Sequence, residues 1–138
     1  MFEKIVEKLK KSGYKLTPQR LEIIRILVAN AKGHLSHNEI YTIAKGKLRT
    51  VSFSTLYNTL QLLEELGIIR QFNIQGETRI ELNMVSHINL IQQNKNSITD
   101  VDDESLIQEI ANRLKINDKS KTILVNVILY DNTDSSKE

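Results

Sequence analysis

The chain has 138 residues, 40% of them apolar, which is enough for a buried core and leaves room for one ordinary domain or two small ones. It contains no cysteine, so disulfides, thiolate zinc sites and a cysteine nucleophile are excluded. No apolar stretch is long enough for a signal peptide or a membrane span, so we expect a cytoplasmic protein without membrane association.

The net charge of +2 is unevenly distributed along the chain. Residues 1–83 hold 13 Lys and Arg against 8 Asp and Glu, whereas residues 84–138 hold 6 against 9. Because phosphate contacts come largely from Lys and Arg, the basic first part is the candidate nucleic-acid binder.

Three helices are predicted before residue 50. Residues 5–12 have amphipathic spacing and end at a Ser-Gly pair. Thr17 as N-cap and Pro18 at the first helical position begin a second helix, which should end near Asn30. Residues 36–39 have the pattern of a capping box and open the third helix.

A fourth helix is predicted from about Ser52 to a C-cap near Gly67. Its expected buried face consists of Phe53, Leu56, Leu60 and Leu63. Its opposite stripe consists of Ser54, Tyr57, Asn58 and Gln61. Uncharged hydroxyls, amides and one aromatic are typical of a helix face that reads base edges in the major groove, whereas a solvated face usually carries Glu and Lys.

Residues 69–83 are predicted to form a hairpin with its turn at residues 75–77. One side should carry Phe72, Ile74, Ile80 and Leu82, and the other Asn73, Gln75, Arg79 and Glu81. Helices followed by a two-stranded hairpin form a winged helix, in which one helix reads DNA and the wing contacts the backbone.

A second unit is predicted after this hairpin. Strands are expected at residues 87–92 and near Ile98, followed by a helix capped by Asp102 or Asp103. Residues 123–130 are almost continuously apolar, as in a strand buried on both faces. About 45 residues cannot cover both faces of such a sheet, so we expect a second subunit to cover it and the protein to be a homodimer.

The predicted fold class is therefore α+β, an N-terminal winged helix-turn-helix followed by a small α/β dimerisation domain. The predicted boundaries are residues 1–83 for the DNA-binding domain, 84–88 for a hinge, 89–132 for the dimerisation domain and 133–138 for a tail.

Several segments together resemble the ferric uptake regulator family. They are residues 14–20 (YKLTPQR), 34–36 (HLS), 40–41 (IY), 54–60 (STLYNTL) and 66–67 (LG). The resemblance implies a dimeric winged-helix repressor that responds to iron, zinc, manganese or peroxide. The two-fold symmetry of a dimer in turn implies a pseudo-palindromic operator in double-stranded DNA.

The resemblance also implies residues of the DNA-binding surface. Tyr57 matches a DNA-contacting Tyr of the family, whereas Asn58 stands where the family often has Arg. Arg20 is a candidate backbone contact, with a plain helix-surface cation as the alternative. The full candidate set is Tyr14, Lys15, Arg20, Ser54, Thr55, Tyr57, Asn58, Gln61 and Arg79.

The sequence departs from the family at the metal ligands. The family has a His-rich run and a cysteine pair after the wing. Here only His87 remains of the run, since Ile88 and Asn89 replace an Asp and a second His. Gln92 and Lys95 replace the two cysteines, so the thiolate zinc site is absent.

One family site between the two domains could survive in part. The matching residues are His34, Glu81, His87 and Asp100. Two imidazoles and two carboxylates can hold one divalent ion per subunit, Zn, Fe or Mn. In the alternative interpretation, His34 packs at a helix start, Glu81 is a surface charge of the wing and His87 lies in a linker. Because ligands have been lost, the sequence favours a regulator with weakened or lost metal dependence, and a metal-responsive repressor is the alternative.

Parts of the sequence are compatible with two other function classes. An acidic cluster at residues 100–104, together with His87, could suit a metal hydrolase, but Asp102 and Asp103 are more simply helix N-terminal acids. The sequence has no phosphate-binding Gly-rich loop, nucleophile elbow or HExxH motif, so we predict that the protein is not an enzyme. A winged helix that binds only proteins is the remaining alternative, and the uncharged stripe on the fourth helix argues against it.

Overall fold

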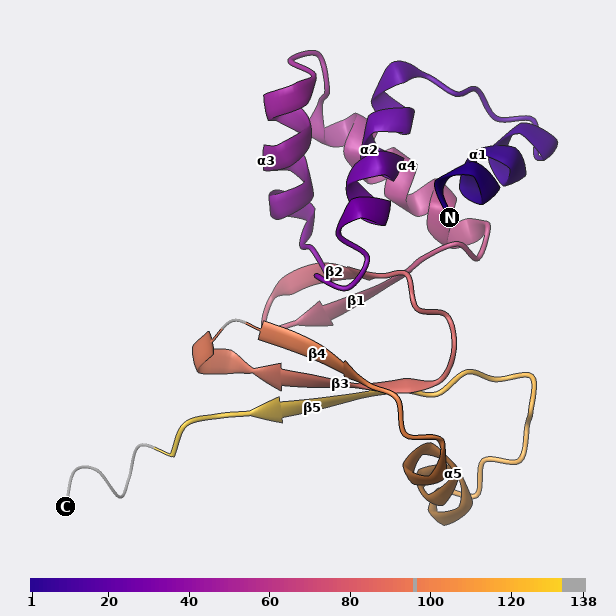
Figure 1. Cartoon of the computed structure of the whole chain (residues 1–138), viewed down its shortest axis with the longest axis vertical. Coiled ribbons are helices and arrows are strands. Elements are labelled where there is room, and N and C mark those ends of the chain that lie inside the picture. The colour runs from indigo at the N-terminus through magenta and orange to yellow at the C-terminus, as the bar shows by residue number, and fades with distance from the viewer. Residues whose placement is uncertain (96, 133–138) are drawn as a thin grey trace. The chain divides into compact units, whose positions relative to one another are not determined.

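The computed structural model describes residues 1–95 and 97–132 (Figure 1). The chain divides into two compact units, Met1–Met84 and Val85–Glu138, and each is described by itself. The predicted hinge overlaps a strand, because His87 and Ile88 begin the first strand of the second unit. The predicted tail, residues 133–138, lies outside the described residues. In the described ranges, no helix has both the length and the apolar character needed to cross a membrane.

The first unit begins with the four predicted helices (Figure 1). They are α1 (Phe2–Lys11), α2 (Pro18–Ala29), α3 (His37–Lys47) and α4 (Phe53–Glu65). Each of the last three has the side-chain cap that satisfies free N–H groups at a helix start. The capping side chains are those of Thr17, Ser36 and Ser52, and Ser36 forms a complete capping box with Glu39.

Aliphatic side chains from all four helices form the core of this unit. On α4 the buried residues include Leu56, Thr59, Leu60 and Leu63, but not Phe53. The prediction for Phe53 is wrong: it is 44% exposed, and its ring lies 5.6 Å from the ring of Tyr41. Phe53 is the first residue of α4, one turn before the helix reaches the core.

The predicted wing is a two-stranded antiparallel sheet of β1 (Arg70–Ile74) and β2 (Glu77–Glu81). Gln75 and Gly76 connect the strands and have φ angles of 54° and 84°. Two successive residues with positive φ are typical of the tight turn whose twist matches that of a hairpin.

The predicted facing of the two strands is wrong. Phe72 lies directly opposite Arg79, and Gln71 lies opposite Ile80. Directly opposite residues share a face, so Phe72 and Arg79 point to one side and Ile80 to the other. The two-residue turn pairs even-numbered residues of β1 with odd-numbered residues of β2, whereas the prediction placed a three-residue turn at residues 75–77. A shift of one residue exchanges the two faces of a strand.

The second unit contains a three-stranded sheet of order β4-β3-β5 and the helix α5 (Figure 1). Its elements are β3 (His87–Gln92), a short 3-10 turn η1 (Gln93–Lys95), β4 (Ser97–Val101), α5 (Glu104–Arg113) and β5 (Leu124–Leu129). β3 pairs with β4 in the antiparallel sense and with β5 in the parallel sense. With the winged helix before it, this unit confirms the predicted α+β class.

In the single chain β5 is not buried on both faces, and the expectation that a second subunit covers it stays a prediction. β5 is an edge strand that pairs only with β3, and Val127 and Leu129 are 39% and 49% exposed. On α5 the buried residues are Ile107 and Ala111, whereas Leu106 is 44% exposed. An apolar edge strand of this kind is a surface that proteins usually cover or pair.

Candidate functional site

A groove of about 590 Å³ lies beside the N-terminal part of α4, within the first unit. Its lining residues are Gly13, Tyr14, Lys15, Thr17, Gln19, Arg20, Thr55, Asn58 and Thr59. The structure thus brings together five of the predicted DNA-binding residues from the α1–α2 connection, α2 and α4. Two cations beside hydroxyl and amide groups form a surface suited to a phosphate backbone.

The predicted reading stripe of α4 is accessible over most of its length. Ser54, Tyr57 and Asn58 are exposed, and Tyr57 has an exposed fraction of 46%. Gln61 is half-buried. The stripe therefore presents one hydroxyl, one phenol and one amide from successive turns of a helix, as direct readout of base edges requires.

Arg20 has a partner inside the protein. Its Nη1 donates to the backbone carbonyl of Lys15 at 2.8 Å, and its own N–H donates to the Thr17 hydroxyl. The guanidinium therefore holds the connection that carries Tyr14 and Lys15. Arg20 is therefore a positioning residue of the groove.

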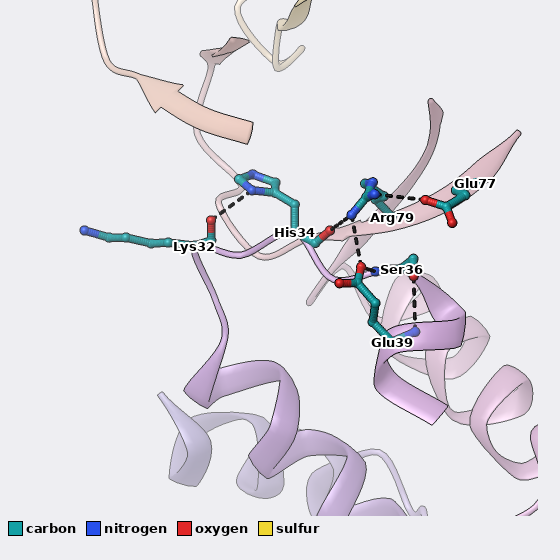
Figure 2. Close-up of polar contacts among 6 residues, drawn as sticks. All are labelled: Lys32, His34, Ser36, Glu39, Glu77 and Arg79. Atoms are coloured by element: carbon teal, nitrogen blue, oxygen red, sulfur yellow. Dashed lines mark hydrogen bonds and ion pairs between the residues drawn. The ribbon is translucent and has the colours of Figure 1, made fainter. Parts of the chain in front are cut away.

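Arg79 is differently placed from the prediction (Figure 2). Its side chain is only 11% exposed, and its guanidinium donates to the backbone carbonyl of His34 and to the carboxylates of Glu39 and Glu77. These three contacts lie at 3.1, 3.1 and 2.9 Å. Arg79 thus ties the wing to the segment before α3, and we omit it from the DNA-binding surface.

His34 is buried and paired with Glu81. Its Nε2 lies 2.6 Å from a carboxylate oxygen of Glu81, and both side chains are 1% exposed. Its Nδ1 lies 3.0 Å from the backbone carbonyl of Lys32 (Figure 2). Since a carbonyl only accepts, Nδ1 carries the hydrogen and Nε2 is the atom directed at the carboxylate.

The backbone at His34 is held in an unusual conformation. His34 has a φ of 49°, which costs a non-glycine residue about 1–2 kcal/mol. Contacts to β2 hold this segment: Arg79 binds the His34 carbonyl, Ile80 N donates to Leu35 O, and Ser36 forms a bridge with Arg79. Strained backbone that is held by several neighbours is common at functional sites.

In the second unit, His87 begins β3 and is 1% exposed. Its Nδ1 donates to the backbone carbonyl of Val85 at 2.7 Å, which leaves the lone pair on Nε2. His87 and Asp100 each offer one possible ligand atom, and these two atoms lie within 4.8 Å of each other. The interpretation of Glu81 as a surface charge and His87 as a linker residue is therefore wrong.

Ile88 and Asp103 have structural roles in the second unit. Ile88, which stands where an Asp was expected, is 4% exposed and belongs to the apolar side of β3. Asp103 caps α5, and the hydrogen bond from the Leu106 backbone, with that from the Ser105 hydroxyl, lowers the pKa of its carboxyl. Asp103 and Glu104 of the acidic cluster thus belong to a helix start, whereas Asp100 lies in β4.

Sequence reasoning assigned no role to His37, Gln71 or Glu64, yet they form one chain of hydrogen bonds. His37 Nε2 donates to Gln71 Oε1 at 2.6 Å, and the backbone and side-chain N–H groups of Gln71 donate to the Glu64 carboxylate at 2.8 and 3.3 Å. The chain connects α3, the wing and α4. Its members are up to 34 residues apart, so no local pattern could have revealed it.

The model of the ferric uptake regulator family matches residues 11–130. The chain is 40% identical over 129 residues to a ferric uptake regulation protein homolog of Archaeoglobus fulgidus, covering 94% of this chain and 96% of that protein. It is 32% identical over 118 residues to the ferric uptake regulation protein of Bacillus subtilis, covering 80% and 79%.

Among solved structures, the ferric uptake regulator Fur of Helicobacter pylori has the same fold, with a TM-score of 0.73 at 23% identity. The match covers all of this chain and 95% of that one. Regulators of this family bind operator DNA and are dimeric. The chain belongs to the ferric uptake regulator family and is a DNA-binding transcription regulator, not an enzyme.

Proposed function

We propose that this protein is a metal-responsive repressor that takes one divalent ion per subunit, Zn, Fe or Mn. The observation that carries the proposal recurs in both units. His34 and His87 each donate Nδ1–H to the carbonyl of the residue two positions earlier. Each also has a carboxylate nearby, that of Glu81 for His34 and that of Asp100 for His87. Metal-binding histidines are typically held in this way, because the hydrogen bond selects the tautomer and orients the ring.

The proposed ligands form two pairs. His34 and Glu81 come from the first unit, and His87 and Asp100 come from the second. Two imidazoles with two carboxylates suit Fe²⁺, Mn²⁺ and Zn²⁺. Metal binding at these residues would change the affinity for operator DNA.

This proposal differs from the weakened metal dependence that the sequence alone favoured. That expectation followed from the ligands that the sequence lacks. The proposal rests on the hydrogen bonds that orient the remaining histidines. The buried pair of His34 and Glu81, with a backbone that Arg79 holds in place, is a prepared half-site rather than a remnant.

For DNA, we propose that the α4 stripe of Ser54, Tyr57, Asn58 and Gln61 enters the major groove. Tyr14, Lys15 and Thr55, from the groove beside α4, would contact the phosphate backbone, and Arg20 would hold the segment that carries the first two. We propose that the protein binds its operator in the cytoplasm.

We also propose a homodimer that forms through the edge strand β5, whose apolar side chains are exposed in the single chain. Its two-fold axis would match a pseudo-palindromic operator with half-sites about one helical turn or more apart.

Operator titrations of the full chain, with chelator and with added Mn²⁺, Fe²⁺ or Zn²⁺, test the proposal. We expect specific binding to fall by more than about tenfold in chelator, or about 1.4 kcal/mol. His34→Ala and Asp100→Asn should cause the same loss in the presence of metal, whereas Asp102→Asn, an exposed acid two residues further on, should not. A loss smaller than tenfold would instead support weakened metal dependence.

A further inference from the structure

An aromatic side chain is partly exposed to solvent at the start of α4. Phe53 is the first residue of this helix and is 44% exposed. Tyr57, four residues further on, is 46% exposed, and residues four apart lie on the same side of a helix. Neighbouring exposed rings form a larger apolar surface than a single exposed residue does, and larger apolar surfaces are typical of binding sites. Phe53 therefore extends the exposed side of α4 that carries Tyr57.

Two rings of α3 pack against Phe53. The Tyr41 ring lies 5.6 Å from it at an interplanar angle of 64°, and the His37 ring lies 6.4 Å from it at 58°. Aromatic pairs prefer such tilted and edge-to-face arrangements. His37 is in turn hydrogen-bonded to Gln71 of the wing. The Phe53 ring is therefore fixed on one side and accessible on the other, so a contact made through it costs little conformational entropy.

The same imidazole also contacts Tyr57. The rings of His37 and Tyr57 lie 6.4 Å apart in a T-shaped arrangement, with an interplanar angle of 78°. One aromatic patch thus consists of Phe53, Tyr57, His37 and Tyr41. Lys45 lies beside this patch, with its Nζ 6.0 Å from the centre of the Tyr41 ring. A cation next to apolar rings suits a polyanion that also exposes apolar groups, as duplex DNA does.

The position of Phe53 in α4 limits what its ring can contact on DNA. In helix-turn-helix proteins, the N-terminal residues of the reading helix contact base edges in the major groove. A phenyl ring has no hydrogen-bond donor, so it cannot read the polar groups of a base edge as the side chains of the α4 stripe can. The apolar group that the major groove offers is the C5-methyl group of thymine, and Phe is among the side chains that contact it.

We infer that Phe53 is a specificity-determining residue whose ring packs on the methyl group of a thymine in each operator half-site. The inference rests on the proposed entry of the α4 stripe into the major groove, and it adds one apolar contact to the polar contacts of that stripe. Tyr41 and His37 are positioning residues, because they hold the ring from α3.

Replacement of thymine by uracil tests the inference, because uracil lacks only the methyl group. The probe is a duplex that the full chain selects from a random-sequence library, and each thymine in it is replaced in turn. We expect binding to weaken about fourfold at one thymine of each half-site, as the loss of one buried methyl group predicts. Phe53→Ala should bind the thymine and uracil forms of that position equally. Phe53→Leu keeps an apolar side chain and should still prefer thymine.

Three further variants complete the comparison. Tyr41→Ala removes a ring that holds Phe53 and should reduce the thymine preference at the same position. Phe2→Ala, the matched control, removes a phenyl ring from α1, where it lies 5.3 Å from the Arg25 guanidinium, and should leave every thymine-to-uracil ratio unchanged. Thermal melts establish that each variant folds. Phe53→Gln has a long polar side chain, should also lose the preference, and keeps the test valid if Phe53→Ala does not fold.

The outcomes separate this inference from the proposal on which it rests. If neither Phe53→Ala nor Tyr57→Ala weakens binding to the selected duplex, the proposed reading surface is overturned. If Tyr57→Ala weakens binding but folded Phe53→Ala keeps the thymine-to-uracil ratios of the parent, only the role of Phe53 is overturned. A parent protein that binds the thymine and uracil forms equally at every position would overturn that role as well.

Discussion

His34 Nε2 lies 2.6 Å from a carboxylate oxygen of Glu81, and both side chains are excluded from solvent. His34 Nδ1 donates its hydrogen to the Lys32 carbonyl, so Nε2 is the ring atom that faces the carboxylate. A metal ion that binds this pair needs a neutral imidazole and a carboxylate, because only deprotonated groups act as ligands.

The first prediction is that metal binding releases protons and weakens as the pH falls. Calorimetric titration in two buffers with different ionisation enthalpies measures the number released. Glu81→Gln should lower both the affinity and that number, whereas Asp102→Asn should leave both unchanged. Equal heats in the two buffers would contradict the prediction.

The second prediction concerns Arg79, which joins the wing to the His34 segment (Figure 2). Arg79→Met should destabilise the protein by about 1–3 kcal/mol, because it removes a largely buried donor to a backbone carbonyl and to two carboxylates. Urea unfolding measures this loss. Arg113→Met, which removes an arginine that is 80% exposed and paired with Glu109, should cost less than about 0.5 kcal/mol. Similar losses in the two variants would mean that Arg79 is only a surface cation.

The third prediction follows from the capping box at α3. Burial acts to raise the pKa of Glu39, but hydrogen bonds from Ser36 and Arg79 outweigh it and lower this pKa below its ordinary value of 4.5. A carboxyl group whose pKa is lowered by folding stabilises the protein above its unfolded pKa, and this contribution is lost as the pH falls through the folded value.

Glu39→Gln should therefore be less stable than the parent at pH 7, and the difference should shrink below pH 4.5. Urea unfolding at several pH values provides the comparison. Glu77→Gln removes the other carboxylate partner of Arg79 but no helix cap. It therefore separates the contribution of the ion pair with Arg79 from that of the capping box. A difference that does not depend on pH would argue against the assigned role of the Glu39 charge.

The fourth prediction separates base readout from phosphate contact. Tyr57→Ala should weaken operator binding by about 1–3 kcal/mol and affect random DNA little, if the phenol reaches a base edge. Lys15→Ala should weaken both about equally and reduce the salt slope by about one. Fluorescence titrations at several salt concentrations measure both quantities. If both variants bind as the parent does, the reading surface lies elsewhere.

The fifth prediction concerns assembly. Leu129→Lys places a charge on the exposed edge strand β5 and should shift the protein toward the monomer at micromolar concentration. Thr99→Lys makes the same change on the other edge strand, β4, and should leave the dimer intact. Light scattering reports the mass of each. A parent protein that is itself monomeric would refute the proposed dimer.

The sequence predicted those parts of the fold that depend on local chemistry. Thr17 with Pro18, and Ser36 with Glu39, specify helix starts within four residues of chain, and both starts are where they were expected. At the start of α5 the prediction left Asp102 and Asp103 open, and Asp103 is the cap. Capping is a short-range interaction, so a single segment contains all the information it needs.

The errors arose where the outcome depends on register or on distant partners. The side to which Phe72 points depends on whether the turn has two or three residues. The engagement of Arg79 depends on His34 and Glu39, about 40 residues away along the chain. In the candidate site, the identities of His34 and His87 were readable by resemblance, but the hydrogen bonds that orient their rings were not.

The hydrogen-bond chain from His37 through Gln71 to Glu64 has a consequence for how a signal can act. It fastens α3, the wing and α4 to one another, and Arg79 fastens the wing to the segment before α3. Packed and cross-linked elements resist gradual deformation. The DNA-binding unit therefore behaves as a rigid body. A regulatory signal can change its orientation but not the pattern of side chains that it presents to DNA. Signal sensing and sequence recognition can then evolve separately, since a change at a residue outside this unit leaves the recognition surface untouched.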